Sequence, residues 1–232
     1  MERLKLELEE LVQDLNISES IAALNKRFNG RLALSTAFGQ EGQVLTDIIF
    51  KNDHPVKVFT IDTGRMFQET YEVYSRTTAR YNKPIKVYFP DRDDVENLIQ
   101  EKGPNSFYES IENRKECCFI RKLKPLRRAL FGVDVWISGL RNGQSDFRKS
   151  LSRFEWDDRF KVIKYHPMIN WTDQDVKDYL DDHNVPYNRL HDQGYPSIGC
   201  APCTRPVAPG ESARAGRWWW ETSKKECGLH SA

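Results

Sequence analysis

The sequence predicts an α/β fold, a single domain in which a mostly parallel sheet is flanked by helices and followed by a loop-rich C-terminal tail. Short apolar runs alternate with amphipathic helical stretches between about residues 31 and 138. Such alternation makes the strands parallel and covers both faces of the sheet. After residue 150 the alternation fades, and Gly, Pro and Cys become frequent toward the C-terminus.

The elements follow one another in a regular order. Strands are expected at 31–34, 56–61, 85–89, 133–138 and 161–164. Helices are expected near 3–14, 18–28, 42–50, 67–81, 95–99, 119–130 and 171–183. The last helix begins at Thr172, because Asp175 three residues later completes a capping box. Ligands of parallel sheets bind beyond the carboxyl ends of the strands, which directs attention to residues 35–40, 62–67 and 139–148.

Composition excludes several functional classes. The net charge is +1, from 35 basic and 34 acidic side chains, so the chain lacks the overall positive field that duplex nucleic acid requires. The N-terminus is charged and helical in pattern, unlike a signal peptide, and no apolar run approaches the roughly 20 residues that span a bilayer. We therefore expect a cytoplasmic protein with no nucleic-acid or membrane partner, whose cysteines are reduced.

The five cysteines divide into four and one. Cys117 and Cys118 are adjacent, Cys200 and Cys203 form a C-x-x-C pair, and Cys227 stands apart. Four thiolates could hold either a tetrahedral zinc ion or a cubane iron–sulfur cluster, and spacing alone does not choose between them. Buried cysteines without a metal are the third possibility. An adjacent pair that points both sulfurs inward is expected to need a strained backbone.

Four separated motifs carry a family resemblance. They are Lys115-Glu116-Cys117-Cys118-Phe119-Ile120-Arg121-Lys122, Gly199-Cys200-Ala201-Pro202-Cys203-Thr204-Arg205-Pro206, Gly216-Arg217-Trp218-Trp219-Trp220 and Glu226-Cys227-Gly228-Leu229-His230. In this order they resemble the assimilatory adenosine 5′-phosphosulfate (APS) reductases. The resemblance implies a [4Fe-4S] cluster on Cys117, Cys118, Cys200 and Cys203, with Cys227 as the catalytic nucleophile. Reductases of 3′-phosphoadenosine 5′-phosphosulfate (PAPS) share the last motif but typically lack the four ligands.

Two loops are candidates for nucleotide binding. The first holds Ser35, Phe38 and Gly39 between a predicted strand and helix, where backbone amides can bind an anion; a purely structural turn is the alternative. It resembles the modified loop of the adenine-nucleotide α-hydrolase superfamily, which implies that fold here. The second loop, similar to the adenosine-binding segment of that family, comprises Ile61, Asp62, Thr63 and Gly64. For Asp62, a role as helix cap or turn residue is equally compatible.

Basic side chains are the candidates for binding phosphate and sulfate. Lys122 follows Cys118 by four residues on a predicted helix, and so is expected on the same face as that cysteine. Arg214 and Arg217 are spaced to grip oxyanions together, and Arg148 is favoured over Arg141 in the loop after the fourth strand. His230 is either a further substrate-binding residue or a free terminal histidine. The Trp218–Trp220 run is expected to pack under the tail rather than stack on a base.

The resemblance implies thioredoxin-dependent reduction of APS to sulfite and AMP through an S-sulfocysteine on Cys227, in sulfate assimilation and cysteine biosynthesis. Residues 1–205 would form the nucleotide-binding reductase domain with the cluster site, and 206–232 a mobile segment that carries Cys227. Because four cysteines are assigned to the cluster, the reductant, thioredoxin or glutaredoxin, must be a separate protein. Alternatives are a PAPS or dual-substrate reductase, a zinc-stabilised nucleotide-binding or tRNA-modifying protein, and a redox sensor. The sequence leaves a homo-oligomer open.

Overall fold

The computed structural model describes residues 2–144, 148 and 151–222. These residues form two compact units. Unit 1 contains the described parts of Met1–Thr60, Glu72–Lys86 and Gly132–Asn188. Unit 2 contains the described parts of Ile61–Tyr71, Val87–Phe131 and Arg189–Ala232. Both units are built from separated stretches of chain.

The strands form one sheet with the order β3-β2-β1-β4-β6-β5. Their bounds are β1 Leu32–Ser35, β2 Lys57–Ile61, β3 Lys86–Tyr88, β4 Val135–Ile137, β5 Phe154–Asp157 and β6 Val162–Tyr165. β1 pairs in parallel with β2 and β4, and β4 pairs in parallel with β6. Among the described strand pairs, only the pair of β5 with β6 is antiparallel. The predicted α/β class with a mostly parallel sheet is confirmed.

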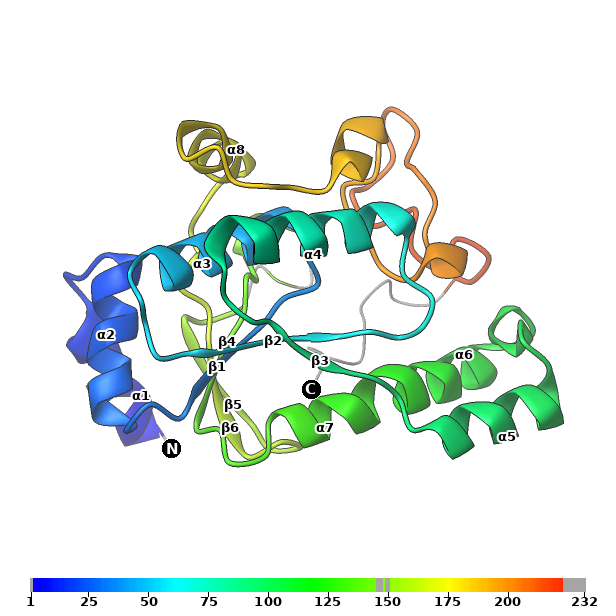
Figure 1. Ribbon diagram of the computed structural model, residues 1–232, viewed down its shortest axis with the longest axis horizontal. Helices are drawn as coiled ribbons and strands as arrows, with labels where there is room; N and C mark the ends of the chain where they lie inside the picture. Colours follow the sequence, from blue (N-terminus) through cyan, green and yellow to red (C-terminus); the bar gives the residue numbers. More distant parts are fainter. Residues whose placement is uncertain (1, 145–147, 149–150, 223–232) are drawn as a thin grey trace. The chain divides into compact units, whose positions relative to one another are not determined.

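Unit 1 holds the main apolar core. Its helices are α1 Glu2–Val12, α2 Ile17–Arg27, α3 Gln40–Lys51, most of α4 Gln68–Tyr81, and α8 Asp173–Asp182. α3 packs against α2, α8 and β1, and α1 packs against β5 (Figure 1). Side chains from α1, α2 and α3 meet the buried faces of β1, β4 and β6 in one cluster. The predicted capping box of α8 is present, since Thr172 Oγ1 accepts a hydrogen bond from the Asp175 amide at 3.1 Å.

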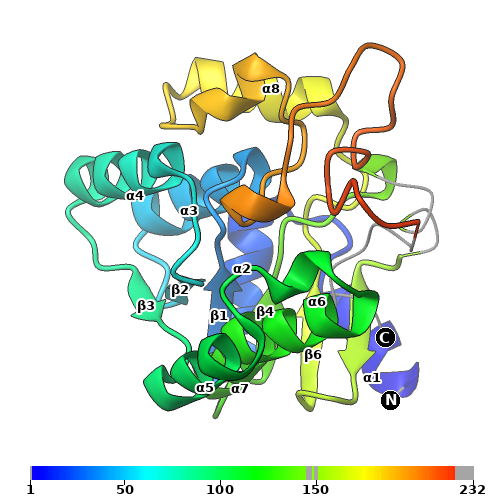
Figure 2. The ribbon, with the colours of Figure 1, turned by 90° about the vertical axis from the view of Figure 1, so that its right-hand side faces the viewer.

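Unit 2 holds a helical segment and a loop-rich segment. The helical part consists of α5 Arg92–Lys102, α6 Ile111–Cys118, the π-helix η2 Phe119–Leu123 and α7 Lys124–Ala129. α5 lies beside the segment formed by α6, η2 and α7 (Figure 2). Within the described part of residues 189–222, the regular structure consists of the short helices η5 Arg189–Gln193 and η6 Ala201–Cys203 and one isolated bridge. The expected loop-rich character of this segment is confirmed.

Two expectations need correction. The helix expected at 119–130 instead begins at Ile111, because Ser110 caps it by accepting a hydrogen bond from the Asn113 amide at 3.0 Å. The strand β5 was not predicted from the sequence, because its alternating run of apolar and polar residues is only four residues long and it pairs only at the sheet edge. Among the described residues, no helix has the length and apolar character needed to cross a membrane.

Candidate active site

The four cysteines outside the C-terminal segment line one small cavity in unit 2, called here the cysteine cavity. Its lining consists of Arg65, Phe107, Arg114, Cys117, Cys118, Arg121, Lys122, Cys200, Pro202 and Cys203. Thr63 Oγ1 lies 3.2 Å from Cys200 Sγ, so residues more than 130 positions apart in the sequence are in contact at this cysteine. The structure thus gathers the four cysteines that were predicted to act as one set, with Lys122 beside them.

Cys117 and Cys118 end α6, directly before the π-helix η2. Cys118 has φ −65° and ψ −38°, an ordinary helical conformation, so the strain expected for an adjacent pair is not present. The π-helix widens the chain at this point: the Lys124 amide donates to the Phe119 carbonyl, five residues back. It also places the buried Lys122 on the cavity, beside Cys118. Local π geometry inside helices is frequent at functional sites.

Cys200 and Cys203 sit on a tight 3₁₀ turn. The Cys203 amide donates to the Cys200 carbonyl at 2.9 Å, and the Thr204 hydroxyl donates to the same carbonyl at 3.0 Å. The turn is tied to neighbouring chain, because the Ala201 amide donates to the Arg65 carbonyl at 2.8 Å and the Trp218 amide donates to the Cys203 carbonyl at 3.2 Å. Both sulfurs are therefore held at the cavity by main-chain contacts.

Although Arg114 is paired with Glu221, basic side chains predominate around the cavity. Arg65, Arg114, Arg121 and Lys122 line it, and its described lining includes no acidic side chain. Burial raises the pKa of Cys200, but the charge of Lys122, the hydrogen bond from Thr63 and the charge of Arg217 together lower it below the usual value. Burial and the neighbouring Cys200 raise the pKa of Cys203 to about 12. These surroundings therefore favour the thiolate form of Cys200 over that of Cys203.

The donor set of the cavity fits a group that takes thiolate ligands. Four thiols with cations around them suit an anionic group held by cysteine alone. The buried Nε of Arg121 has no hydrogen-bond partner among the described residues, which is compatible with an acceptor or anion bound at the cavity. In the part of the chain that is described, no three His, Cys, Asp or Glu side chains converge closely enough to share one metal ion.

The tryptophan run packs beside the cavity. Trp218 is completely buried, with the guanidinium of Arg114 4.7 Å and that of Arg217 4.9 Å from its ring. Arg114 also forms a buried ion pair with Glu221, with Nη2 2.7 Å from Oε1. Trp220 stacks edge-on against Tyr108 at 4.4 Å. The expected packing role of these tryptophans matches their burial, although Trp219 remains 41% exposed.

Arg214 and Arg217 reach the same hydroxyl. Nη1 of each guanidinium lies 3.2 Å from Ser197 Oγ, which accepts from both. Arg217 is buried and its Nε lacks a hydrogen-bond partner among the described residues. The structure thus brings the predicted arginine pair together, as two adjacent guanidiniums within unit 2.

The loop after β1 has an unusual backbone. Phe38 adopts φ 58° and its side chain is completely buried against Tyr74, so a ligand could meet only its main chain. Gly39 is the N-cap of α3 and offers no side chain to the first helical amides. Ser35 Oγ accepts a hydrogen bond from the indole of Trp136 at 2.8 Å. The N-cap of α3 therefore provides no side-chain hydrogen bond to the first main-chain amides of the helix. Helix N-termini that bind anions use main-chain amides of this kind.

The loop after β2 belongs to unit 2. Asp62 Oδ1 accepts from the Gly64 amide at 2.8 Å and from the Tyr71 hydroxyl at 3.0 Å, so this carboxylate shapes the turn. Gly64 has φ 70°, the left-handed conformation that favours glycine. Ile61 ends β2, and the Thr63 carbonyl accepts from Arg121 Nη1 at 2.7 Å. This second predicted loop is therefore attached directly to the cysteine cavity.

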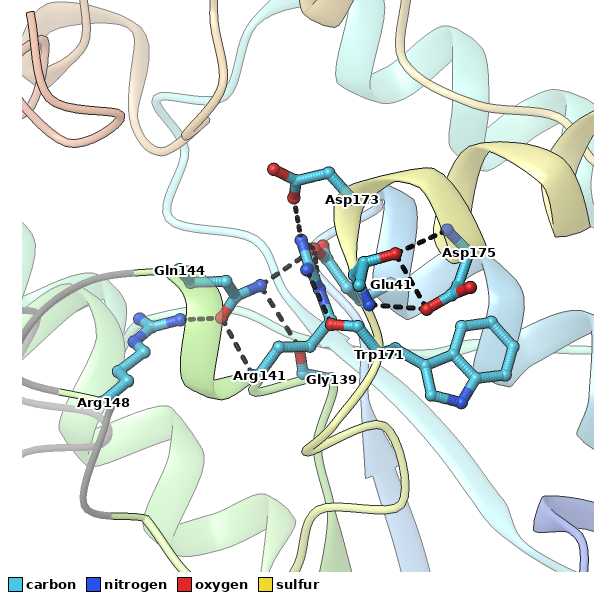
Figure 3. A network of polar contacts seen from close by, with 9 residues as sticks. Glu41, Gly139, Arg141, Gln144, Arg148, Trp171, Asp173 and Asp175 are labelled. Carbon is cyan, nitrogen blue, oxygen red and sulfur yellow. Dashed lines mark hydrogen bonds and ion pairs between the residues drawn. The ribbon is translucent and has the colours of Figure 1, made fainter.

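The loop after β4 contains a polar network in unit 1 (Figure 3). Arg141 donates to Glu41 from Nε at 2.9 Å and from Nη2 at 2.8 Å, and it also pairs with Asp173 at 2.5 Å. Arg148 donates instead to the neutral Gln144. Two carboxylates thus occupy Arg141.

Several residues at the site were not identified from the sequence. Arg65, Arg114 and Arg121 line the cysteine cavity, and Arg121 could have been inferred from its position beside Lys122. Arg65 directly follows the predicted loop Ile61–Gly64, and Arg114 lies three residues before Cys117, so both had a positional signal that was not used. Cys227 and His230 lie outside the described residues.

A mostly parallel sheet, together with a cavity in unit 2 lined by four cysteines, defines an α/β protein with a cysteine-rich site. The chain belongs to the phosphoadenosine phosphosulfate reductase family, whose domain model matches residues 31–206. The family expected from the cysteine and tryptophan motifs is confirmed.

Individual relatives agree with this assignment. The adenosine 5′-phosphosulfate reductase of Sinorhizobium fredii is 43% identical over 97% of this chain and 90% of its own length. That of Allochromatium vinosum is 45% identical over 86% of this chain and 78% of its own length. The crystal structure of the phosphoadenylyl-sulfate reductase of Candida auris, a phosphate complex, is 31% identical, with a TM-score of 0.73 over 86% of this chain and 95% of that one.

Proposed function

We propose that this protein reduces APS to sulfite and AMP, in the assimilation of sulfate for cysteine biosynthesis. The observation that carries the proposal is the cysteine cavity, where four thiols of a family member gather beside Lys122 and three arginines. Relatives 43–45% identical over most of the chain are adenosine 5′-phosphosulfate reductases. The four-cysteine set is the feature that favours APS over PAPS as the substrate.

The proposed chemistry is covalent catalysis by Cys227. Its thiolate attacks the sulfur of the sulfate group, the bond from that sulfur to the phosphate oxygen breaks, and AMP leaves. A thiolate of thioredoxin or glutaredoxin then attacks Cys227 Sγ, and sulfite leaves with the electron pair of the sulfur–sulfur bond. The second thiol of the donor resolves the mixed disulfide, so one dithiol supplies the two electrons that convert sulfate to sulfite.

Cationic side chains would bind the oxyanions of the substrate. We assign this role to Lys122, Arg148, Arg214, Arg217 and His230, and assign the adenosine and phosphate contacts to the loops Ser35–Gly39 and Ile61–Gly64. The adjacent guanidiniums of Arg214 and Arg217 at Ser197 support a paired grip on one oxyanion. Positive charge near the reacting sulfur would also lower the barrier by stabilising the negative charge of the transition state.

We propose that Cys117, Cys118, Cys200 and Cys203 hold a [4Fe-4S] cluster. When bound, the cluster would supply a fixed anionic centre that orders the Lys122 region electrostatically, without a need for electron transfer. The unpartnered Nε of Arg121 and the cationic lining support an anionic occupant.

A PAPS reductase is the second candidate, because the Candida auris PAPS reductase is 31% identical over 86% of this chain. The test combines metal analysis with a thioredoxin-coupled sulfite assay on anaerobically purified protein, with APS and PAPS in parallel. We expect about four iron and four sulfide per chain and sulfite from APS. Comparable rates with PAPS would make it a dual-substrate enzyme. Stoichiometric zinc without sulfide, and no sulfite from either nucleotide, would overturn the proposal.

A further inference from the structure

Gln144 lies between Arg148 and the contacts of Arg141 and Glu41 in the polar network of unit 1 (Figure 3). Its Nε2 donates to Glu41 Oε1 at 2.8 Å and to the Gly139 carbonyl at 3.4 Å. Its Oε1 accepts from the Arg141 amide at 3.2 Å and from Nη1 of Arg148. The carboxamide therefore links the first turn of α3, which carries Glu41, to the predicted anion ligand Arg148.

The neighbours of Gln144 fix the direction of its hydrogen bonds. Glu41 and the Gly139 carbonyl only accept, so the amide nitrogen must face them and the amide oxygen must face Arg148. A carboxylate in place of the carboxamide would lose both donors and would stand against Glu41. An aliphatic side chain would lose the acceptor that Arg148 uses. Only a side chain with a donor and an acceptor on one planar group satisfies both sides.

The neutrality of Gln144 matters as much as its geometry. Arg141 faces two carboxylates, Glu41 and Asp173, which offset its charge. Gln144 contacts Arg148 through a neutral carboxamide, so this contact orients the guanidinium without adding a charge of its own. Arg148 is 8% exposed, so its charge acts in an environment where electrostatic interactions are stronger than in water.

We propose that Gln144 is a positioning residue, which holds the Arg148 guanidinium for an oxyanion of the substrate and couples it to the first turn of α3. The inference rests on the proposed function, since it takes Arg148 to be a ligand of the phosphate or sulfate group. It adds a residue and a role, because Gln144 itself need not touch the substrate.

The test is a double-mutant cycle on the equilibrium binding of APS. Gln144→Glu, Arg148→Ala and the double variant are compared in a Cys227→Ser background, which keeps APS intact during the titration. The matched control is Gln174→Glu on the exposed face of α8, where Gln174 Nε2 donates to Asp178 at 2.7 Å. Unfolding midpoints are measured for every variant, and the cycle is repeated with Gln144→Ala.

We expect Gln144→Glu to weaken APS binding by about tenfold or more, because a hydrogen bond to a charged group and the local charge balance are both altered. In the Arg148→Ala background, Gln144→Ala should cost less than about twofold, since the effect of removing the carboxamide passes through Arg148. Gln174→Glu should leave binding unchanged.

The inference is overturned if the losses of APS affinity caused by the substitutions at Gln144 and Arg148 multiply in the double variant. It is also overturned if the Gln144→Glu variant binds APS as tightly as its parent. Either result leaves the proposed function intact. If the parent does not bind APS and the wild type forms no sulfite, the proposed function fails and the inference falls with it. The two failures are therefore distinguishable.

Discussion

The buried ion pair between Arg114 and Glu221 should be a main stabilising contact of unit 2. Arg114 Nε and Nη2 lie 3.1 and 2.7 Å from Glu221 Oε1, and the side chains are 7% and 5% exposed. Arg114 lines the cysteine cavity and stacks on Trp218, so the pair connects α6 to the segment that leads toward Cys227. We predict that Glu221→Gln strongly destabilises the protein, because it leaves a buried guanidinium without its carboxylate.

Removing one member of a buried ion pair typically costs about 3–5 kcal/mol. For a chain of this size each kcal/mol lowers the unfolding midpoint by about 2–4 °C, so a loss of roughly 6–20 °C is expected. The matched control is Glu211→Gln, which breaks the exposed Arg205–Glu211 pair of similar distance, 2.8 Å. Thermal unfolding followed by circular dichroism gives both midpoints. Equal shifts in the two variants would refute the argument that burial makes the Arg114 pair important.

Three further predictions concern other parts of the molecule. Burial raises the pKa of Asp157, but Arg159 and Lys164 outweigh it and lower the pKa to about 2. The stabilisation from Asp157 should therefore be complete above about pH 4 and lost as the pH falls toward 2; denaturant unfolding of wild type and Asp157→Asn across this range checks it, and a constant difference would contradict it. Gly216→Ala would place a methyl group 2.2 Å from the Arg205 carbonyl oxygen and should cost about 1–3 kcal/mol of unfolding free energy, whereas Gly143→Ala, with no atom within 4 Å, should cost less. Lys122→Gln should weaken APS binding by about tenfold in titrations, while the exposed Lys115→Gln should not; equal affinities would remove Lys122 from the site.

Periodicity in the sequence was sufficient to predict the central part of the fold. The apolar runs of β1, β2 and β4 and the capping box of α8 are local signals, and the structure confirms each of them. The edge strand β5 and the start of α6 were missed. β5 is stabilised by pairing with β6, and α6 begins at a single capping serine, so neither has a long periodic pattern.

Site residues that lie within short sequence motifs could be predicted, whereas contacts between residues far apart in the sequence could not. The cysteines and Lys122 lie in short motifs, and the structure brings them to one cavity. The contacts of Arg114 with Trp218 and Glu221 join residues about 100 positions apart, and no local pattern predicts them. The role of Gln144 depends on Glu41, about 100 residues away, and no local pattern encodes that contact.

The central claim is that Cys227 attacks the sulfate sulfur of APS, and one measurement tests it directly. The protein is incubated with APS in the absence of any thiol donor, and the products are analysed by peptide mass spectrometry with quantification of AMP. We expect one added SO₃ group on the peptide that contains Cys227, together with one AMP released per modified chain. An unmodified Cys227 in a preparation that converts APS to sulfite once thioredoxin is added would contradict the account.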